Sequence, residues 1–118
     1  MNREELVLGL KKILIDQDTI EQYKGLESAE IKPTTDEYGI KVISFYKTLN
    51  QEQRDALFTL VKQIRIDTVA SFFAFLDGSF WIEGQTEDMK LVNLENPNEK
   101  LNEDLTDLFL NLIYNWKQ

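Results

Sequence analysis

Apolar residues recur at helical spacing near the start of the chain. The spacing predicts a helix that begins at the capping residue Asn2 and ends near Gln17, with Tyr23 as an alternative end. Gly25 is expected to stop it. The apolar stripe of this helix is expected to consist of Leu6, Leu10, Ile13, Leu14 and Gln17.

The pattern over Tyr38–Leu49 fits two structures. The alternation of Ile40 and Val42 suits a strand, whereas the apolar residues of the whole stretch also recur at steps of three and four. Thr35, followed by two acids, is typical of a helix start. We therefore expect a helix, and the alternative is a strand that joins the hairpin predicted below in a three-stranded sheet.

A long helix is predicted after Asn50, which forms a capping-box pattern with Gln53. The helix is first amphipathic and then, over Val69–Leu76, apolar on nearly every side, which is typical of a buried helix. Gly78 is expected to end it. Its amphipathic stripe is expected to consist of Leu57, Leu60, Val61 and Ile64.

After the long helix, the spacing of the apolar residues is no longer helical. Phe80–Ile82 and Met89–Leu94 are short runs with strand propensity, and the turn-rich Gly84–Asp88 lies between them. This arrangement predicts a β-hairpin over Phe80–Leu94.

The last predicted helix begins at Asn98 or Asn102 and ends at Trp116, because apolar residues recur along it at helical steps. We therefore expect one domain over residues 1–118. Its class is α+β and predominantly helical, with three or four helices around the Leu57–Leu76 helix and one β-hairpin.

The composition excludes several kinds of site. The chain has no cysteine and no histidine, so it lacks disulfides, thiolate chemistry, histidine bases and the commonest metal ligands. It also has no glycine-rich nucleotide-binding motif. We therefore assign no catalytic residue, no metal ligand and no cofactor.

The acidic residues are unevenly distributed. The net charge is −8, and the window from Asp77 to Asp107 holds nine acids and two bases, which is −7 of that total. Such a surface repels nucleic acid and attracts basic proteins. No apolar run reaches the roughly 18 residues of a membrane span, and the first residues lack a secretory signal. We expect a cytoplasmic protein without nucleic-acid or membrane partners.

Two groups of residues are candidate sites. The first is a partner-binding surface on the predicted hairpin and the last helix, made of Trp81, Glu83, Glu87, Asp88, Glu103 and Asp107. The second is a buried polar network beside the apolar part of the long helix, made of Arg54, Arg65, Asp67 and Ser71.

The stretch Leu49-Asn50-Gln51-Glu52-Gln53-Arg54, continuing to Phe75-Leu76-Asp77-Gly78, resembles small uncharacterised bacterial proteins. In those proteins a helix after L-x-x-E-Q-R ends in L-D-G ahead of a short strand. The resemblance implies a bacterial, cytoplasmic origin and transfers no activity and no site residue.

These patterns leave function and assembly open. The first functional hypothesis is a small non-enzymatic protein that binds another, basic protein as an adaptor, inhibitor or immunity-like factor. The alternative is a carboxylate-dependent or metal-assisted hydrolase that uses Asp67 or the acids between Glu83 and Asp88. For assembly, a monomer whose phenylalanines are covered and a homodimer whose contact excludes Glu83–Asp88 are equally favoured.

Overall fold

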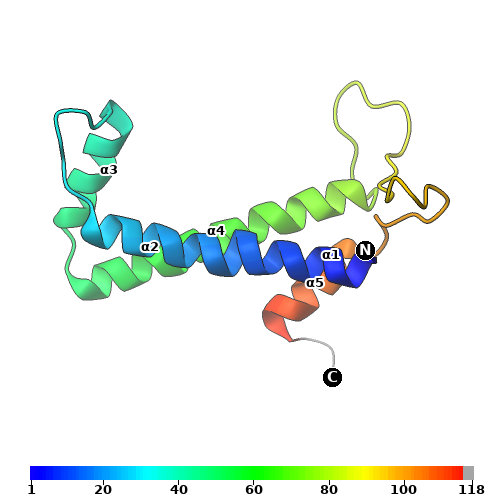
Figure 1. The fold of residues 1–118 in the computed structure, drawn as a ribbon, viewed down its shortest axis with the longest axis horizontal. Coiled ribbons are helices and arrows are strands. Elements are labelled where there is room, and N and C mark those ends of the chain that lie inside the picture. The colour runs from blue at the N-terminus through cyan, green and yellow to red at the C-terminus, as the bar shows by residue number, and fades with distance from the viewer. Residues whose placement is uncertain (116–118) are drawn as a thin grey trace.

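The first helical rod is longer than its sequence pattern indicates. In a computed structural model that describes residues 1–115, helix α1 (Arg3–Leu10), the π-helix η1 (Lys11–Gln17) and helix α2 (Asp18–Ser28) follow one another without a break (Figure 1). Asn2 caps the rod, as predicted, and its side chain accepts a hydrogen bond from the Glu5 amide. Gly25 does not end it.

The π-helix changes which residues face the core. An α-helix would place Val7 and Ile15 about 80° apart, whereas the wider turns of η1 bring them nearly into line. Both are fully buried, and Ile13 of the predicted stripe is half exposed. The ion pair between Lys11 and Asp16 at 2.8 Å joins residues i and i+5, which is the hydrogen-bonding step of a π-helix. The predicted stripe is therefore wrong at Ile13 and Gln17, which are exposed, whereas its Leu14 is half-buried.

Helix α3 (Glu37–Lys47) confirms that the ambiguous stretch is helical, and Asp36 rather than Thr35 caps it. Its Gly39 is packed closely, since a Cβ there would lie 2.8 Å from the Thr35 methyl group.

Helix α4 (Gln51–Leu76) begins and ends as predicted. Asn50 and Gln53 form the capping box, and Gly78 has the left-handed conformation, at φ +84°, that glycine adopts readily after a helix.

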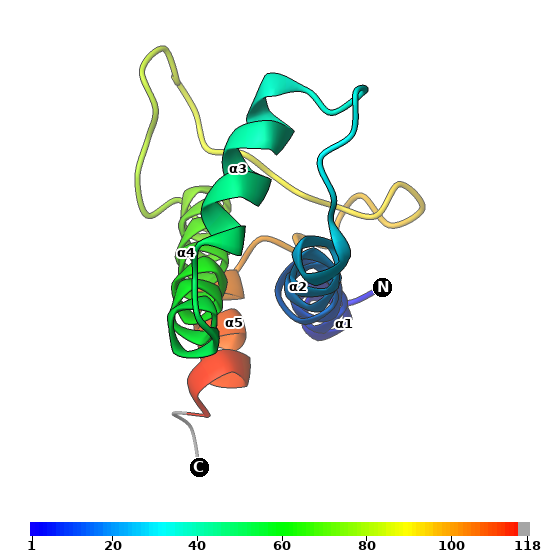
Figure 2. The same ribbon diagram turned by 90° about the vertical axis from the view of Figure 1, so that its left-hand side faces the viewer.

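The rod α1–η1–α2 and helix α4 lie side by side and run in opposite directions (Figure 1). Helix α5 (Leu105–Tyr114) contacts α1 and α4 at the end opposite α3 (Figures 1 and 2). The largest buried cluster lies where α1, η1, α4 and α5 meet. Its members are Val7, Ile15, Ile66, Phe73, Leu105 and Phe109.

The predicted β-hairpin is wrong. Residues 77–104 are irregular, and within residues 1–115 the only strand-like pairing is an isolated bridge between Asn93 and Asn96. The buried Asn102 side chain accepts a hydrogen bond from the Leu91 amide at 2.7 Å and donates one to the Met89 carbonyl at 2.8 Å. It thereby occupies backbone groups of the second predicted strand. The part of the chain described is helical and irregular, not α+β.

Helix α5 begins later than predicted, at Leu105. Asp77, the residue that follows the end of α4, supplies its cap, because the Asp77 carboxylate accepts hydrogen bonds from the Leu105 and Thr106 amides at 3.1 and 2.9 Å. The predicted end at Trp116 lies outside the described residues.

The molecule is elongated. Its radius of gyration is 18.3 Å, whereas a compact domain of this length has about 13.5 Å. Its accessible surface is 8634 Å², against about 6,600 Å² for a compact monomer of 13.8 kDa. Roughly 2,000 Å² of additional surface is therefore left in contact with solvent.

Within residues 1–115, no helix is both long and apolar enough to cross a membrane.

Candidate functional site

Four of the predicted partner-binding residues lie in one exposed loop. Trp81, Glu83, Glu87 and Asp88 all belong to the irregular segment 78–104, which projects at the opposite end of the molecule from α3 (Figure 1). The Trp81 indole donates a hydrogen bond to the Asp88 carboxylate at 3.2 Å, which fixes the ring beside an acid while half of it stays exposed.

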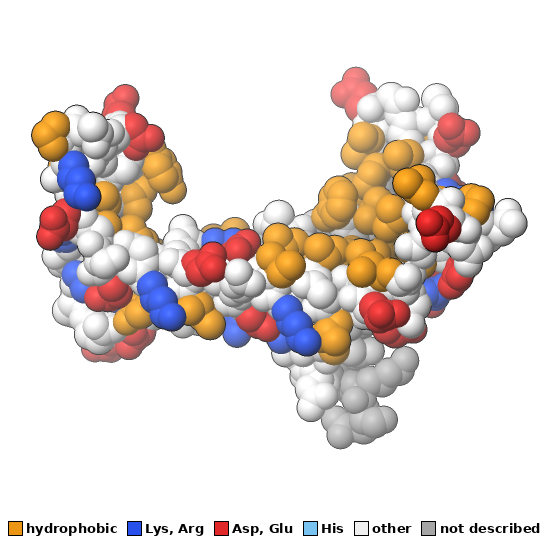
Figure 3. All heavy atoms as spheres, in the orientation of Figure 1, with side chains coloured by type: hydrophobic (Ala, Val, Ile, Leu, Met, Phe, Trp, Pro, Cys, Tyr) orange, Lys and Arg blue, Asp and Glu red, His pale blue; other side chains and the backbone are white. Residues whose placement is uncertain are grey.

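Large apolar side chains accompany these acids. Leu94 is 96 % exposed and Ile82 is 57 % exposed, although both belong to residue types that normally lie inside. Hydrophobic side chains gather on the sides of α3 and of the 78–104 segment that face each other across the hollow between them (Figure 3). The exposed large apolar residues of the segment are Phe80, Trp81, Ile82, Met89 and Leu94.

The two remaining predicted contact residues lie next to the start of α1. Glu103 forms an ion pair with Arg3 at 3.3 Å, and Asp107 lies one turn further along, on α5. Asp107 and Asp104 line a shallow depression of about 280 Å³ with Arg3 and Glu4. These acids therefore extend the acidic surface of the 78–104 segment onto the first turn of α5.

The acids do not converge as a metal site would require. Among residues 1–115, no group of three or more Asp, Glu, His or Cys side chains is arranged to hold a metal ion. Asp77, which lies near Glu103 and Asp107, is already used to cap α5.

The proposed polar network is not brought together. The Arg65 guanidinium donates to Gln22 of α2 at 2.6 Å, and Arg54 pairs with Glu27. Asp67 is exposed and accepts a hydrogen bond from Gln63, one turn earlier on the same helix. Ser71 is also exposed. The two arginines therefore connect α4 to α2, and the two other residues face solvent.

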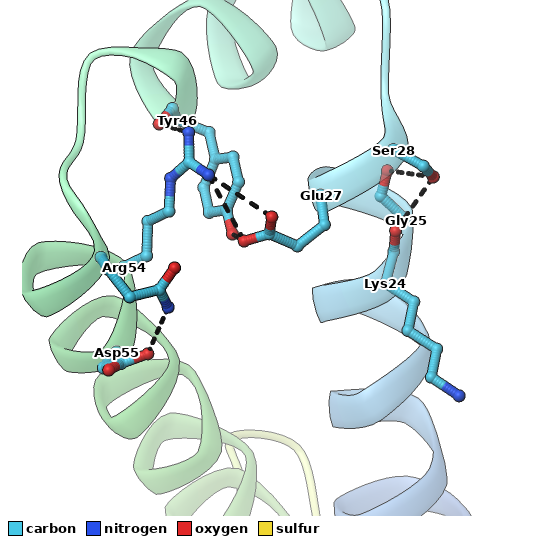
Figure 4. Close-up of polar contacts among 8 residues, drawn as sticks. Lys24, Gly25, Glu27, Ser28, Tyr46, Arg54 and Asp55 are labelled. Atoms are coloured by element: carbon cyan, nitrogen blue, oxygen red, sulfur yellow. Dashed lines mark hydrogen bonds and ion pairs between the residues drawn. The ribbon is translucent and has the colours of Figure 1, made fainter.

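A polar cluster that the sequence did not indicate holds α3. We call it the clamp; it comprises Glu27 of α2, Tyr46 of α3 and Arg54 of α4 (Figure 4). The Tyr46 hydroxyl donates a hydrogen bond to the Glu27 carboxylate. The Arg54 guanidinium lies 3.4 Å from that carboxylate and 4.3 Å from the centre of the Tyr46 ring, in a cation–π contact.

The clamp is suited to structure rather than to catalysis. Burial, together with the hydrogen bond to Glu27, raises the pKa of Tyr46 to about 12. The phenol therefore stays protonated at physiological pH and is a poor nucleophile or base. The ring of Phe58 packs edge-on against Tyr46 and against Tyr23, with centroids 6.1 and 5.1 Å apart, which adds apolar contact to the polar one.

Only part of the clamp could be predicted from the positions of its residues in the sequence. Tyr46 and Arg54 flank a helix cap, so their approach follows from the tight connection between α3 and α4. Glu27 reaches them because the first rod continues past Gly25, which the sequence pattern did not predict. A depression of about 300 Å³ with mostly apolar walls lies beside the clamp, between α2 and α3, and is lined in part by Leu26, Val42 and Ile43.

No family model, curated protein or solved structure matches the chain. The bacterial origin implied by the resemblance of Leu49–Gly78 therefore stays a prediction.

Proposed function

We propose that this protein is a non-enzymatic binding protein whose ligand is another, basic protein. The contact surface is the 78–104 segment together with the first turn of α5. The protein would act as an adaptor, an inhibitor or an immunity-like factor.

The observation that carries the proposal is the combination of exposed apolar side chains and acids in one segment. Residues 78–104 hold seven acids and two bases, and the exposed Phe80, Trp81 and Ile82 lie among them. Protein interfaces have this composition, because aromatic anchors supply binding energy at the centre while a charged rim stays hydrated.

The sign of the charge selects the partner. A surface of net charge −5 over residues 78–104 attracts a basic protein from a distance and repels an acidic one. Asp107 and the neighbouring Glu4 enlarge the same negative region. The attraction is strongest at low salt, because ions screen exposed charges over about 10 Å at 0.1 M.

The alternative of a hydrolase has no observation in its favour within residues 1–115. Asp67 accepts a hydrogen bond from Gln63 of its own helix. The acids between Glu83 and Asp88 lie on an exposed loop. A hydrolytic site needs several such groups around one reacting atom.

Photo-crosslinking tests the proposal with a matched pair of positions. A crosslinking amino acid is placed at Ile82 in one chain and at Ile20 in a control, since their exposed fractions are 57 % and 53 %. We expect a basic protein to be captured from a lysate of the source organism at position 82 only.

The captured protein is then purified and its affinity measured. We expect Trp81→Ala to weaken binding about tenfold or more, as for an aromatic anchor, and Ile20→Ser to leave it unchanged. Raising the salt concentration from 50 to 300 mM should also weaken binding of the unmodified chain. Capture of the same protein at both positions, or an affinity that is independent of salt, contradicts the proposal.

A further inference from the structure

Helix α4 has a second apolar face that no part of residues 1–115 covers fully. At 3.6 residues per turn this face spans an arc of about 120°, which lies roughly half a turn from the side that contacts α5. Leu60, Ile64 and Phe72 are 57, 53 and 60 % exposed on it. We call it the α4 stripe; it consists of Leu57, Leu60, Val61, Ile64, Thr68, Ser71, Phe72 and Phe75.

The α4 stripe differs from the 78–104 segment because it is uncharged. None of its residues is acidic or basic over five helical turns, or about 27 Å. The charged residues of this part of α4 lie outside the stripe; they are Lys62, Arg65 and Asp67. Charge complementarity therefore cannot select a partner here, whereas apolar shape can.

The order of residues in the stripe makes it complementary to itself. When two copies of α4 cross in opposite directions about a two-fold axis at the level of position 66 along the helix, Leu60 of each copy lies opposite Phe72 of the other. Ile64 then lies opposite Thr68, and Leu57 opposite Phe75. The larger phenylalanines thus meet leucines, and the small polar Thr68 lies near the axis. A two-fold contact requires this reciprocity, in which i meets j and j meets i.

The surface area fits a second copy. The chain exposes about 2,000 Å² more than a compact monomer of its mass, and a standard interface takes about 800 Å² from each partner. A dimer contact of this size along α4 buries about 800 Å² of the additional surface and leaves the remainder for the partner at the 78–104 segment. The antiparallel arrangement also places the two acidic segments at opposite ends of the dimer, where they do not repel each other.

We propose that the α4 stripe binds a second copy of this chain, in an antiparallel two-fold homodimer whose axis crosses α4 at the level of position 66, on the face opposite the buried Ile66 side chain. This inference does not depend on the basic partner, because it uses a different face. Glu83–Asp88 lies outside the dimer contact, whereas Phe80 borders it, because its ring packs against Phe75 of the stripe with centroids 5.7 Å apart.

The mass of the full chain in solution is the first test. At micromolar concentrations, sedimentation should give twice the chain mass of 13.8 kDa. Ile64→Glu should give a folded monomer by sedimentation and circular dichroism, because it places two charges in the apolar contact. Ile20→Glu is the matched control, since its exposed fraction is also 53 %, and it should remain a dimer. A wild-type monomer, or an Ile64→Glu dimer, overturns the proposal.

Cysteine crosslinking tests the register, and the absence of natural cysteine makes it clean. A mixture of Leu60→Cys and Phe72→Cys chains should form a 60–72 disulfide between copies. Leu60→Cys alone should not crosslink, because antiparallel pairing holds the two positions about 18 Å apart along the axis. Crosslinking of Leu60→Cys with itself but not with Phe72→Cys would overturn the antiparallel arrangement. Trp81→Ala should leave the dimer intact, which separates failure of this proposal from failure of the partner-binding one.

Discussion

At the α5 end of the molecule, apolar side chains from α1, η1, α4 and α5 meet in one buried cluster, whereas at the α3 end one buried tyrosine is held by an acid and an arginine. The first end resembles the core of an ordinary domain. The second holds α3 mainly through the clamp and leaves Tyr38, Ile40 and Phe45 exposed on it. Stability is therefore concentrated at one end, and local opening is easier at the other.

The largest expected effect is on the apolar end. Phe73 is buried and packs edge-on against Phe109, with ring centroids 5.4 Å apart. Phe73→Ala removes this contact and leaves a cavity, so it should lower the free energy of unfolding by about 3–5 kcal/mol. Phe45→Ala is the matched aromatic change on the exposed face of α3 and should cost less than about 1 kcal/mol. Urea denaturation measures both, and equal losses would contradict the comparison.

The next largest loss of stability is expected where the 78–104 segment attaches to the α5 end of the molecule. Asn102 is buried, and its amide nitrogen donates to the Leu76 carbonyl at 2.6 Å as well as to the segment. Asn102→Ala leaves part-buried backbone groups without this partner and should cost about 2 kcal/mol. The exposed Asn98 offers a control, since Asn98→Ala should change stability by less than about 0.5 kcal/mol. Protection of α3 amides from hydrogen exchange should stay unchanged in both variants.

A smaller effect is expected at the clamp. Glu27→Gln removes the charge that Arg54 pairs with and weakens the acceptor for Tyr46, at a cost of about 1 kcal/mol because the pair is partly exposed. Hydrogen exchange should show faster opening of α3, while amides of α5 keep their protection. Glu21→Gln on the same helix is the control. Faster exchange at both ends would show that the two ends open together.

The last effect appears only in alkali and is absent at neutral pH. The pKa of Tyr46 is raised from 10.0 to about 12 in the folded chain, so its contribution to stability is complete below pH 10. Between pH 10 and 12 the unfolded chain loses the tyrosine proton first, and the free energy of unfolding falls. Tyr46→Phe should show a shallower fall over this window in urea titrations. Parallel curves for the two proteins would contradict the role of the clamp.

The helices illustrate what could be predicted from sequence. The start of α4 was predicted from Asn50 and Gln53 because a capping box is local, and its end was predicted because Gly78 favours a left-handed conformation. The helix over Tyr38–Leu49 was also predicted. These features depend on neighbours within a few residues, so they can be predicted from the local sequence.

The errors depend on distant residues. The hairpin prediction treated Met89–Leu94 by itself, but Asn102 binds the backbone of this stretch from outside it. Helix α5 begins where Asp77, 28 residues earlier, supplies the cap. The clamp was missed because Glu27 reaches Tyr46 only after the rod α1–η1–α2 and helix α4 have packed against each other. The predicted contact acids remain a proposal, since their exposure alone identifies no partner.

The π-helix has a consequence for how the length of this chain can vary. Seven residues of η1 turn through about the angle of six residues in an α-helix. A chain with one residue fewer between Lys11 and Gln17, wound as an ordinary α-helix, would therefore keep Val7 and Glu27 on their present faces. The same deletion within α2 would rotate Glu27 by about 100° away from Arg54. In an alignment, a one-residue gap in the middle of this rod would thus mark a change that leaves both ends of the molecule as they are.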